Sequence, residues 1–263
     1  MSHPGTIDPD RKGPPRPADV EPHVRRALSR GEIASVNLAE SLAVEFHVLI
    51  SHAAPLVGEP AAQRLAEAAQ QGMGITKRHR LAAELLLERF GPGGIESIAG
   101  HTSDTVRGWA CGMIGLARGW TLEQRLTAIR PFADDPHQNV REWAWMALRE
   151  HIISELPEAI ERLADWSASH RPNLRRFAAE STRPRGVWCQ HIAALKHDPE
   201  PGLPLIEPLR SDDEKYVQDA VGNWLNDAGK TNAGWVMSVT GRWLDESDTP
   251  QTRRIVRRAR RNL

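Results

Sequence analysis

The feature that most constrains the fold is a helical segment that recurs four times between residue 104 and residue 227. The copies are DTVRGWACGMIG (104–115), NVREWAWMALRE (139–150), NLRRFAAESTRP (173–184) and, more loosely, YVQDAVGNWLND (216–227). Their leading apolar residues, Val106, Val140, Leu174 and Val217, are separated by 34, 34 and 43 residues. Periods of this length are typical of stacked helical pairs. Amphipathic segments at 122–133, 156–167 and 201–209 precede the later copies. We therefore predict an all-α, HEAT-like repeat solenoid, a right-handed α-α superhelix.

Aligning the four copies sorts the faces of the repeated helix. Positions zero, four and eight, counted from the leading residue, are almost all apolar, so we predict that they face the partner helix. Position three holds Trp109, Trp143 and Phe177, which we interpret as core residues. Position one holds an arginine in the first three copies, and in HEAT arrays this arginine usually pairs with an acid in a neighbouring turn.

Positions two, five, six and nine form a further face. In the first copy they are the small residues Gly108, Cys111, Gly112 and Gly115, and in later copies they include an acid, a tryptophan and several arginines. A glycine inside a helix costs about 1 kcal/mol relative to alanine, so its presence needs a reason. We interpret this face as a shallow concave groove with a carboxylate and an aromatic ring on its wall.

The ends and the cysteines bound the remaining possibilities. Residues 1–20 are rich in proline, glycine and charge, which predicts a flexible N-terminal segment before a single HEAT-like repeat domain at 21–263. The sequence contains no apolar run of about 18 residues, so we predict no membrane-spanning helix. The first residues have no apolar segment typical of a signal peptide. Cys111 and Cys189 lie far apart without zinc spacing, so we expect a reducing cytosol, no metal and no other cofactor.

Charge is balanced over the whole chain but not along it. The formal net charge is zero, whereas residues 253–263, RRIVRRARRNL, contain six arginines. Arg254, Arg257, Arg258 and Arg261 recur at helical spacing and predict one basic stripe. Such a stripe suits phosphate groups, and it is equally typical of a solvated terminal helix.

Three blocks carry a resemblance to a known family. They are Glu142-Trp143-Ala144, then Arg175-Arg176…Ala179-Glu180…Arg183-Pro184-Arg185…Trp188, and then Asn223…Leu225-Asn226-Asp227…Lys230. On these residues the chain, over roughly 21–263, resembles the HEAT-repeat alkylpurine DNA glycosylases, the AlkC and AlkD group, and is closer to the AlkC branch. It departs from the family where the acid-aromatic run leads into Met146-Ala147-Leu148 instead of Arg-Pro-Phe.

The resemblance implies a glycosylase that removes cationic alkylated purines, such as N3-methyladenine and N7-methylguanine, from double-stranded DNA. Because such a base already carries positive charge, it leaves without being protonated. One carboxylate can then stabilise the oxocarbenium-like sugar and accept a proton from the attacking water. Glu142 is the candidate carboxylate, and Trp145 and Trp188 are candidate walls against the base or sugar.

The same resemblance suggests cations that would hold phosphates on either side of the lesion. These DNA-binding candidates are Arg149, Arg176, Arg183, Arg185, Lys77, Arg78 and Arg80. Structural roles remain open for several residues: Glu142 could pair with Arg149 or Arg176, and Glu180 is expected to buttress an arginine such as Arg183.

Two other functions remain open from the residues. One is a non-catalytic solenoid that binds damaged or branched DNA, which only turnover would separate from a glycosylase. The other is a protein-interaction scaffold, for which salt-dependent DNA binding would be absent. We expect a monomer without a membrane partner, located in the cytoplasm on the nucleoid.

Overall fold

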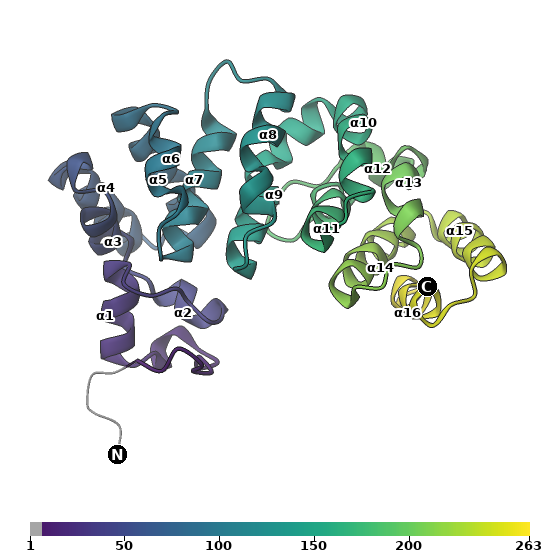
Figure 1. Cartoon of the computed structure of the whole chain (residues 1–263), viewed down its shortest axis with the longest axis horizontal. Helices are drawn as coiled ribbons and strands as arrows, with labels where there is room; N and C mark the ends of the chain where they lie inside the picture. Colours follow the sequence, from purple (N-terminus) through teal and green to yellow (C-terminus); the bar gives the residue numbers. More distant parts are fainter. Residues whose placement is uncertain (1–6) are drawn as a thin grey trace. The chain divides into compact units, whose positions relative to one another are not determined.

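The computed structural model describes residues 7–263, and within that range the chain is helical without a strand. The α-helices are α1 (Pro22–Arg30), α2 (Leu38–Ala43), α3 (Phe46–Ala53), α4 (Glu59–Gln70), α5 (Ile75–Phe90), α6 (Gly94–Ala99), α7 (Asp104–Leu116), α8 (Leu122–Ala133), α9 (Gln138–Ser154), α10 (Leu156–Ser167), α11 (Pro172–Ser181), α12 (Ala193–His197), α13 (Leu203–Ile206), α14 (Lys215–Gly229), α15 (Ala233–Glu246) and α16 (Pro250–Ala259) (Figure 1). The 3-10 turns are η1 (Pro17–Asp19), η2 (Pro55–Val57), η3 (Glu200–Gly202) and η4 (Glu207–Leu209). None of the described helices is long and apolar enough to cross a membrane.

The chain divides into two compact units. The first contains the residues up to Gly119 together with His137–Trp143, and the second contains Trp120–Pro136 together with Ala144–Leu263. The division runs through α9, whose first turns belong to the first unit and whose remainder belongs to the second. The single repeat domain beginning at residue 21 therefore stays a prediction.

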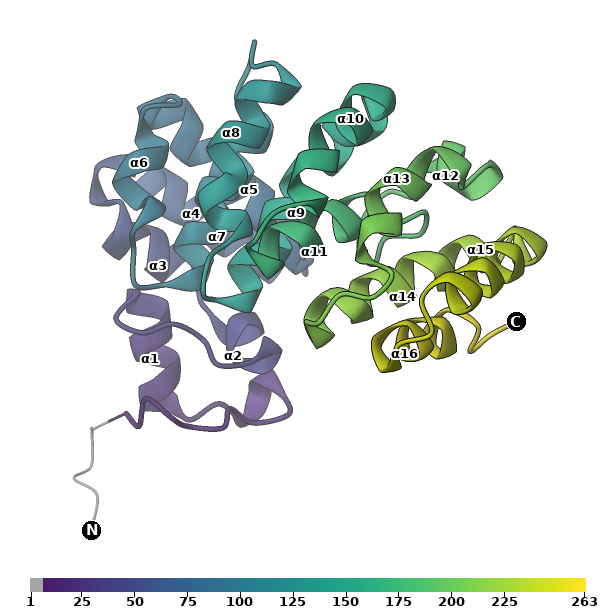
Figure 2. The ribbon, with the colours of Figure 1, turned by 45° about the vertical axis from the view of Figure 1, so that its right-hand side comes forward.

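In the first unit, α3 packs on α4, and α5 packs on α7 (Figure 2). Val106, Ala110 and Ile114 of α7 are fully buried, which confirms the predicted apolar stripe at positions zero, four and eight. The helices α5 and α7 lie so close that a Cβ on Gly112 would be 2.7 Å from the Cβ of Ala83. Glycine at 112 is therefore explained by helix packing.

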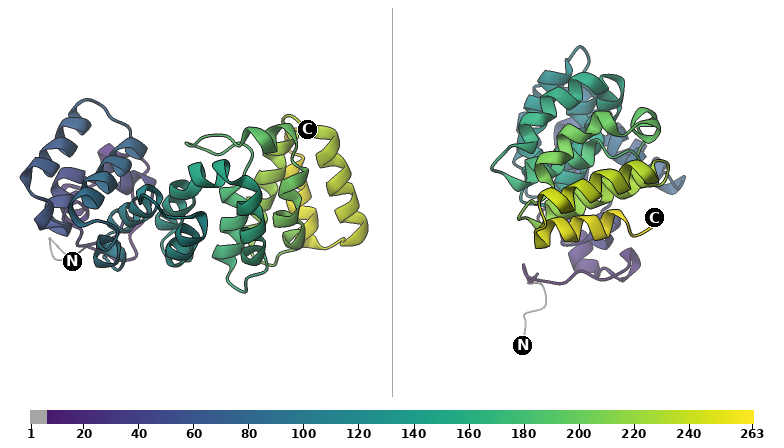
Figure 3. Two further views of the ribbon diagram at one scale, coloured as in Figure 1. Left: turned by 90° about the horizontal axis from the view of Figure 1, so that it is seen from above. Right: turned by 90° about the vertical axis from the view of Figure 1, so that its right-hand side faces the viewer.

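In the second unit, α10 packs on α11, α11 on α14, and α14 on both α15 and α16, seen as neighbouring green and yellow helices in Figure 3. Leu174 and Ala178 of α11 and Val217 and Val221 of α14 are buried, as the repeat predicts. The expected pairing of the position-one arginine with an acid is present in the third copy, where Arg175 donates to both carboxylate oxygens of Asp212 at 2.6 and 3.0 Å.

The predicted open groove on positions five and nine of the repeat is wrong for the fourth copy. A Cβ on Gly222 would lie 2.9 Å from the Cβ of Arg258, and Asn226 donates a hydrogen bond to the carbonyl of Ala259. Helix α16 therefore covers this face of α14. Gly112 in the first copy is covered in the same way by α5, so these small residues permit packing between neighbouring helices.

The N-terminal elements differ from the expected pattern in two respects. The segment 38–50, which reads as one amphipathic helix, is divided into α2 and α3 around Val44 and Glu45. Residues 1–6 of the predicted flexible leader lie outside the described residues. Further along that leader, Arg11 donates to both carboxylate oxygens of the buried Glu40 at 2.9 and 2.7 Å. A buried carboxylate needs such a partner, so this contact holds the leader against the first unit.

Candidate active site and phosphate contacts

The turn of α9 that carries Glu142 is fixed by an aromatic stack in the first unit. Glu142 is half-buried, and the next residue, Trp143, stacks on His79 of α5 with ring centroids 3.6 Å apart. A Cβ on Gly108 of α7 would lie 2.7 Å from the Trp143 ring, so the indole lies close to both α5 and α7. Because neighbouring residues of a helix move together, this packing restrains the position of the Glu142 backbone.

His79 is neutral near pH 7. It is buried, and burial holds the pKa of its imidazole well below the usual range, with the charge of Arg78 lowering that pKa further. Phe46 packs edge-on against the ring at a centroid distance of 4.9 Å. His79 therefore contributes shape and packing beside Trp143, and it supplies no positive charge to this part of α9.

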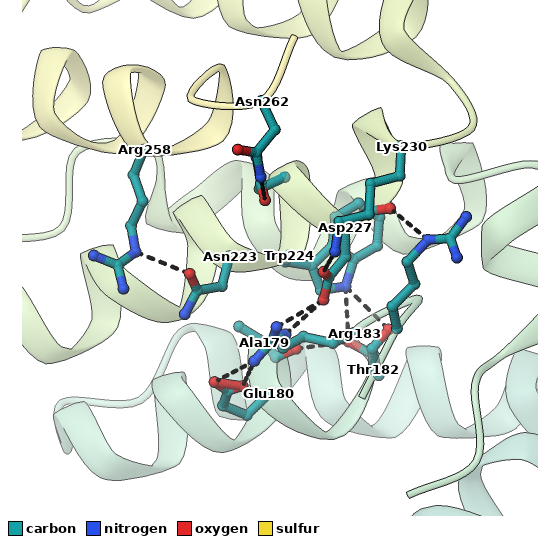
Figure 4. A network of polar contacts seen from close by, with 12 residues as sticks. Ala179, Glu180, Thr182, Arg183, Asn223, Trp224, Asp227, Lys230, Arg258 and Asn262 are labelled. Carbon is teal, nitrogen blue, oxygen red and sulfur yellow. Dashed lines mark hydrogen bonds and ion pairs between the residues drawn. The ribbon is translucent and has the colours of Figure 1, made fainter. Parts of the chain in front are cut away.

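A second cluster lies in the second unit, where Arg183 binds two carboxylates (Figure 4). Its guanidinium is 2.7 Å from Asp227 of α14 and 3.2 Å from Glu180 of α11. Burial lowers the pKa of Arg183, but the two carboxylates outweigh this effect and raise it. Lys230 also lies 3.3 Å from Asp227. This geometry confirms that Glu180 buttresses Arg183, and it pairs both acids with cations.

Arg149 is buried, with 1% of its surface exposed, and acts as a bracket for the segment that follows α11. Its guanidinium donates to the carbonyls of Ser181 and Arg183, each at 2.6 Å, and to that of Gln190 at 3.0 Å. Burial lowers the pKa of Arg149. These contacts assign Arg149 to holding the 181–190 segment, which corrects its interpretation as a phosphate contact.

The segment held by Arg149 presents Trp188 to solvent. Trp188 is 63% exposed and has a φ of 61°, a left-handed conformation that is uncommon outside glycine. Arg185, in the same segment, donates to the carbonyl of Asp227 at 3.2 Å. A Cβ on Gly186 would lie only 2.1 Å from the sulfur of Cys189, so this turn requires glycine. The result is an exposed aromatic ring on a segment that Arg149 holds in place.

The remaining predicted site residues divide by exposure. Lys77 and Arg80 on α5 are exposed, while Arg78 is half-buried with its guanidinium 5.3 Å from the Phe46 ring centroid. Trp145 is 5% exposed, which does not support its predicted contact with a base. Arg176 is 8% exposed, and its guanidinium lies 4.2 Å from the Tyr216 ring centroid. Arg176 also lies 3.6 Å from Glu180, so it is held inside the second unit, contrary to its interpretation as a groove cation.

Comparison with known proteins identifies the family. The model of the family described as DNA alkylation repair enzyme matches residues 121–263, which is more than half of the chain. The chain belongs to the DNA alkylation repair enzyme family. This match confirms the family expected from the three sequence blocks, and it contains all of them.

Relatives of this alkylation repair family member show the same relationship. Uncharacterized protein YhaZ of Bacillus subtilis is 37% identical over 117 residues, which cover 44% of this chain and 32% of YhaZ. The alkylpurine DNA glycosylase AlkC of Pseudomonas fluorescens, solved bound to DNA containing an abasic site analog, has a TM-score of 0.67 at 22% identity. That match covers 81% of this chain and 59% of the AlkC chain. The chain thus spans about a third of YhaZ and somewhat over half of AlkC.

A second solved structure supports the fold. The protein smu.31 of Streptococcus mutans matches with a TM-score of 0.59 at 20% identity, over 76% of this chain and 98% of that one. At these identities the two structures show a shared helical fold, and they do not transfer residue roles to this chain.

Sequence reasoning overlooked His79 and Tyr216 in this alkylation repair protein. Both side chains pack against predicted site residues, His79 on Trp143 and Tyr216 on Arg176. A signal was available for His79, because it opens the apolar pattern of 79–91 and is the only polar residue at a buried position of α5. No pattern in the sequence indicates the pairing of Tyr216 with Arg176.

Proposed function

We propose that this protein is a DNA glycosylase that excises cationic alkylated purines, N3-methyladenine and N7-methylguanine, from double-stranded DNA. Membership of the DNA alkylation repair enzyme family, matched over residues 121–263, is the observation that carries the proposal. The solved glycosylase AlkC, which shares the fold, was captured on DNA with an abasic site analog, the kind of product that base excision leaves. The protein would act as a monomer on nucleoid DNA in the cytoplasm.

The proposed reaction needs only one carboxylate from the protein. The bond between C1′ of the deoxyribose and the ring nitrogen breaks, and its electron pair neutralises the departing cationic base. Water adds to C1′ and gives its proton to the carboxylate, leaving an abasic site. Glu142 is the proposed carboxylate, because it is the acid of the block Glu142-Trp143-Ala144 inside the matched family region. The stack of Trp143 on His79 restrains the turn of α9 that carries it.

Substrate contacts would come from the exposed members of the predicted set and from the half-buried Arg185. Trp188 offers an indole face that could stack on the cationic base or contact the sugar. Lys77, Arg80 and Arg185 are the proposed phosphate contacts, and their charges would hold the backbone near the lesion. Within the second unit, Arg149 would hold the segment that carries Arg185 and Trp188.

The test is release of N7-methylguanine and N3-methyladenine from methylated duplex DNA. We expect the wild type to release both bases and Glu142→Gln to lose at least about 100-fold in rate, the range associated with a general base. Glu150→Gln, on the exposed surface of the same helix α9, is the matched control and is expected to retain wild-type rates.

Two results would change the proposal. Equal rates for wild type and Glu142→Gln would remove Glu142 from the reaction. No release by the wild type, with salt-sensitive binding to the duplex intact, would identify the protein as a non-catalytic DNA binder.

A further inference from the structure

The last helix of the protein carries positive charge that the rest of the molecule does not neutralise. Residues 253–263 contain six arginines and no acid. Arg253 forms an ion pair with Asp248, and Arg254 and Arg258 share the single carboxylate of Asp219 at 2.8 and 3.0 Å. Six guanidinium groups facing two carboxylates leave four unneutralised positive charges on this end of the second unit.

The arginine face is set in place by the packing of α16 on α14. Ile255, Val256 and Ala259 are buried, which fixes the rotation of α16 about its own axis and turns the arginines outward. Gly222 lets the Arg258 backbone approach α14, and Arg258 then donates to Asn223 at 2.9 Å (Figure 4). The glycine and asparagine of the fourth repeat therefore serve to hold this helix.

Arg257 and Arg261 are the most available cations on this face. Both are exposed, and neither lies within ion-pair distance of a carboxylate among the described residues. Arg257 lies on α16 and Arg261 two residues beyond its end, where the Arg261 guanidinium donates to Asn223 at 3.4 Å, next to that of Arg258 at 2.9 Å. A phosphate reaching them displaces water and no protein acid.

The chemistry of the face indicates the kind of partner. The apolar residues of α16 are all packed against the protein, so this helix has no free apolar stripe with which to enter a membrane interface. What it offers is a row of guanidinium groups, which bind phosphate oxygens with planar, bidentate geometry.

We propose that the arginine face of α16 and of the turn after it, formed by Arg254, Arg257, Arg258 and Arg261, binds the phosphate backbone of duplex DNA independently of sequence and of damage. The choice of DNA as ligand rests on the proposed function. The role is distinct from base excision: the face adds a lesion-independent hold on the duplex.

The test measures how salt affects binding to an undamaged duplex, by fluorescence anisotropy of labelled DNA. Each phosphate contact contributes a slope of about −0.9 to log Kobs against log salt concentration. The variant Arg257→Gln/Arg261→Gln should therefore have a slope shallower by about 1.8. Between 50 and 200 mM salt, the wild type should lose about 12-fold more affinity than this variant, which is the same difference in slope expressed as a ratio.

The control changes the same amount of charge elsewhere. Arg26→Gln/Arg64→Gln removes two exposed arginines of the first unit, on α1 and α4, and should leave the slope within about 0.3 of the wild type. An unchanged slope in the α16 variant overturns the proposal. An equal decrease of the slope in the control variant also overturns it, because that result would indicate a general effect of net charge. The proposal also fails if the α16 variant loses binding to a polyglutamate peptide while its DNA binding is unaffected.

Base release separates this inference from the proposed function. If the wild type releases no base and the α16 variant shows the expected decrease in slope, the phosphate-binding face is supported and the glycosylase activity is not. If the wild type releases methylated bases and the α16 variant keeps the slope of the wild type, the glycosylase activity is supported and the phosphate-binding face is not.

Discussion

The bracket formed by Arg149 predicts a large effect from a single buried substitution. Arg149→Met keeps much of the volume of the side chain and removes the donors to the carbonyls of Ser181, Arg183 and Gln190. A buried acceptor left unsatisfied costs about 1–3 kcal/mol. Three such acceptors lose their donor, but water can reach the carbonyl of Gln190. We therefore expect the free energy of unfolding to decrease by about 3 kcal/mol, the lower end of the range for three acceptors. For a chain of this size, that loss lowers Tm by roughly 6–12 °C.

Thermal unfolding followed by circular dichroism measures the stability loss, and trypsin measures its location. The 181–190 segment contains Arg185 followed by Gly186, a bond that trypsin can cut once the segment detaches from Arg149. We expect cleavage after Arg185 to become faster in Arg149→Met and to stay at the wild-type rate in Arg26→Met, where the arginine is exposed. A Tm within 2 °C of the wild type, with unchanged cleavage, would refute the bracket.

Two further predictions concern the first unit and its helix packing. Gly112→Ala should destabilise the protein by about 1–3 kcal/mol in urea unfolding, because its Cβ would meet Ala83 at 2.7 Å. Gly241→Ala on α15 is the control: its Cβ would meet Arg260 at an ordinary contact distance of 3.9 Å, so this variant should be neutral or stabilising by up to about 1 kcal/mol. Equal effects would contradict the close approach. His79 has a pKa held well below its usual range by burial and by Arg78. Below about pH 6.5 the unfolded chain therefore binds a proton that the folded protein does not. The unfolding free energy decreases as the pH is lowered, by at most about 1.4 kcal/mol per pH unit. His79→Phe should remove this contribution, and the same pH dependence in both proteins would count against it.

The sequence predicted the helices and their buried stripe well because both follow from local periodicity. Val106, Ala110 and Ile114 fall on one side of α7 whatever the rest of the chain does, and burying that side is the only way to remove it from water. Arg175 was also interpreted correctly, since its partner Asp212 occupies a turn that the repeat places next to it. The break between α2 and α3 lacked such a signal, because no proline or glycine marks it.

The face formed by positions two, five, six and nine of the repeat was misinterpreted, because periodicity shows which residues share a face and not what covers that face. Gly108, Gly112 and Gly222 looked like the floor of an open groove, and each instead lies against a side chain of another helix. Trp145 and Arg149 were placed in the same groove, and both are buried. A small residue is compatible with an approaching ligand and with an approaching helix, and only the tertiary structure separates the two.

The arginines show the same limit in a form that matters for function. From the sequence, both Arg183, suggested by the family resemblance, and Arg257, suggested by its helical spacing, were candidates for phosphate binding. In the structure, Arg183 binds Glu180 and Asp227, so a phosphate could take it only in competition with two nearly buried carboxylates, which would then keep only Arg176 and Lys230 as partners. Hydrogen bonds to charged groups contribute about 1.5–3 kcal/mol each, more than the 0–1 kcal/mol typical of a solvent-exposed ion pair. Arg257 faces no such competitor. Affinity for the DNA backbone should therefore follow the exposed Arg257 and Arg261, while Arg149 of α9 holds the segment that carries Trp188.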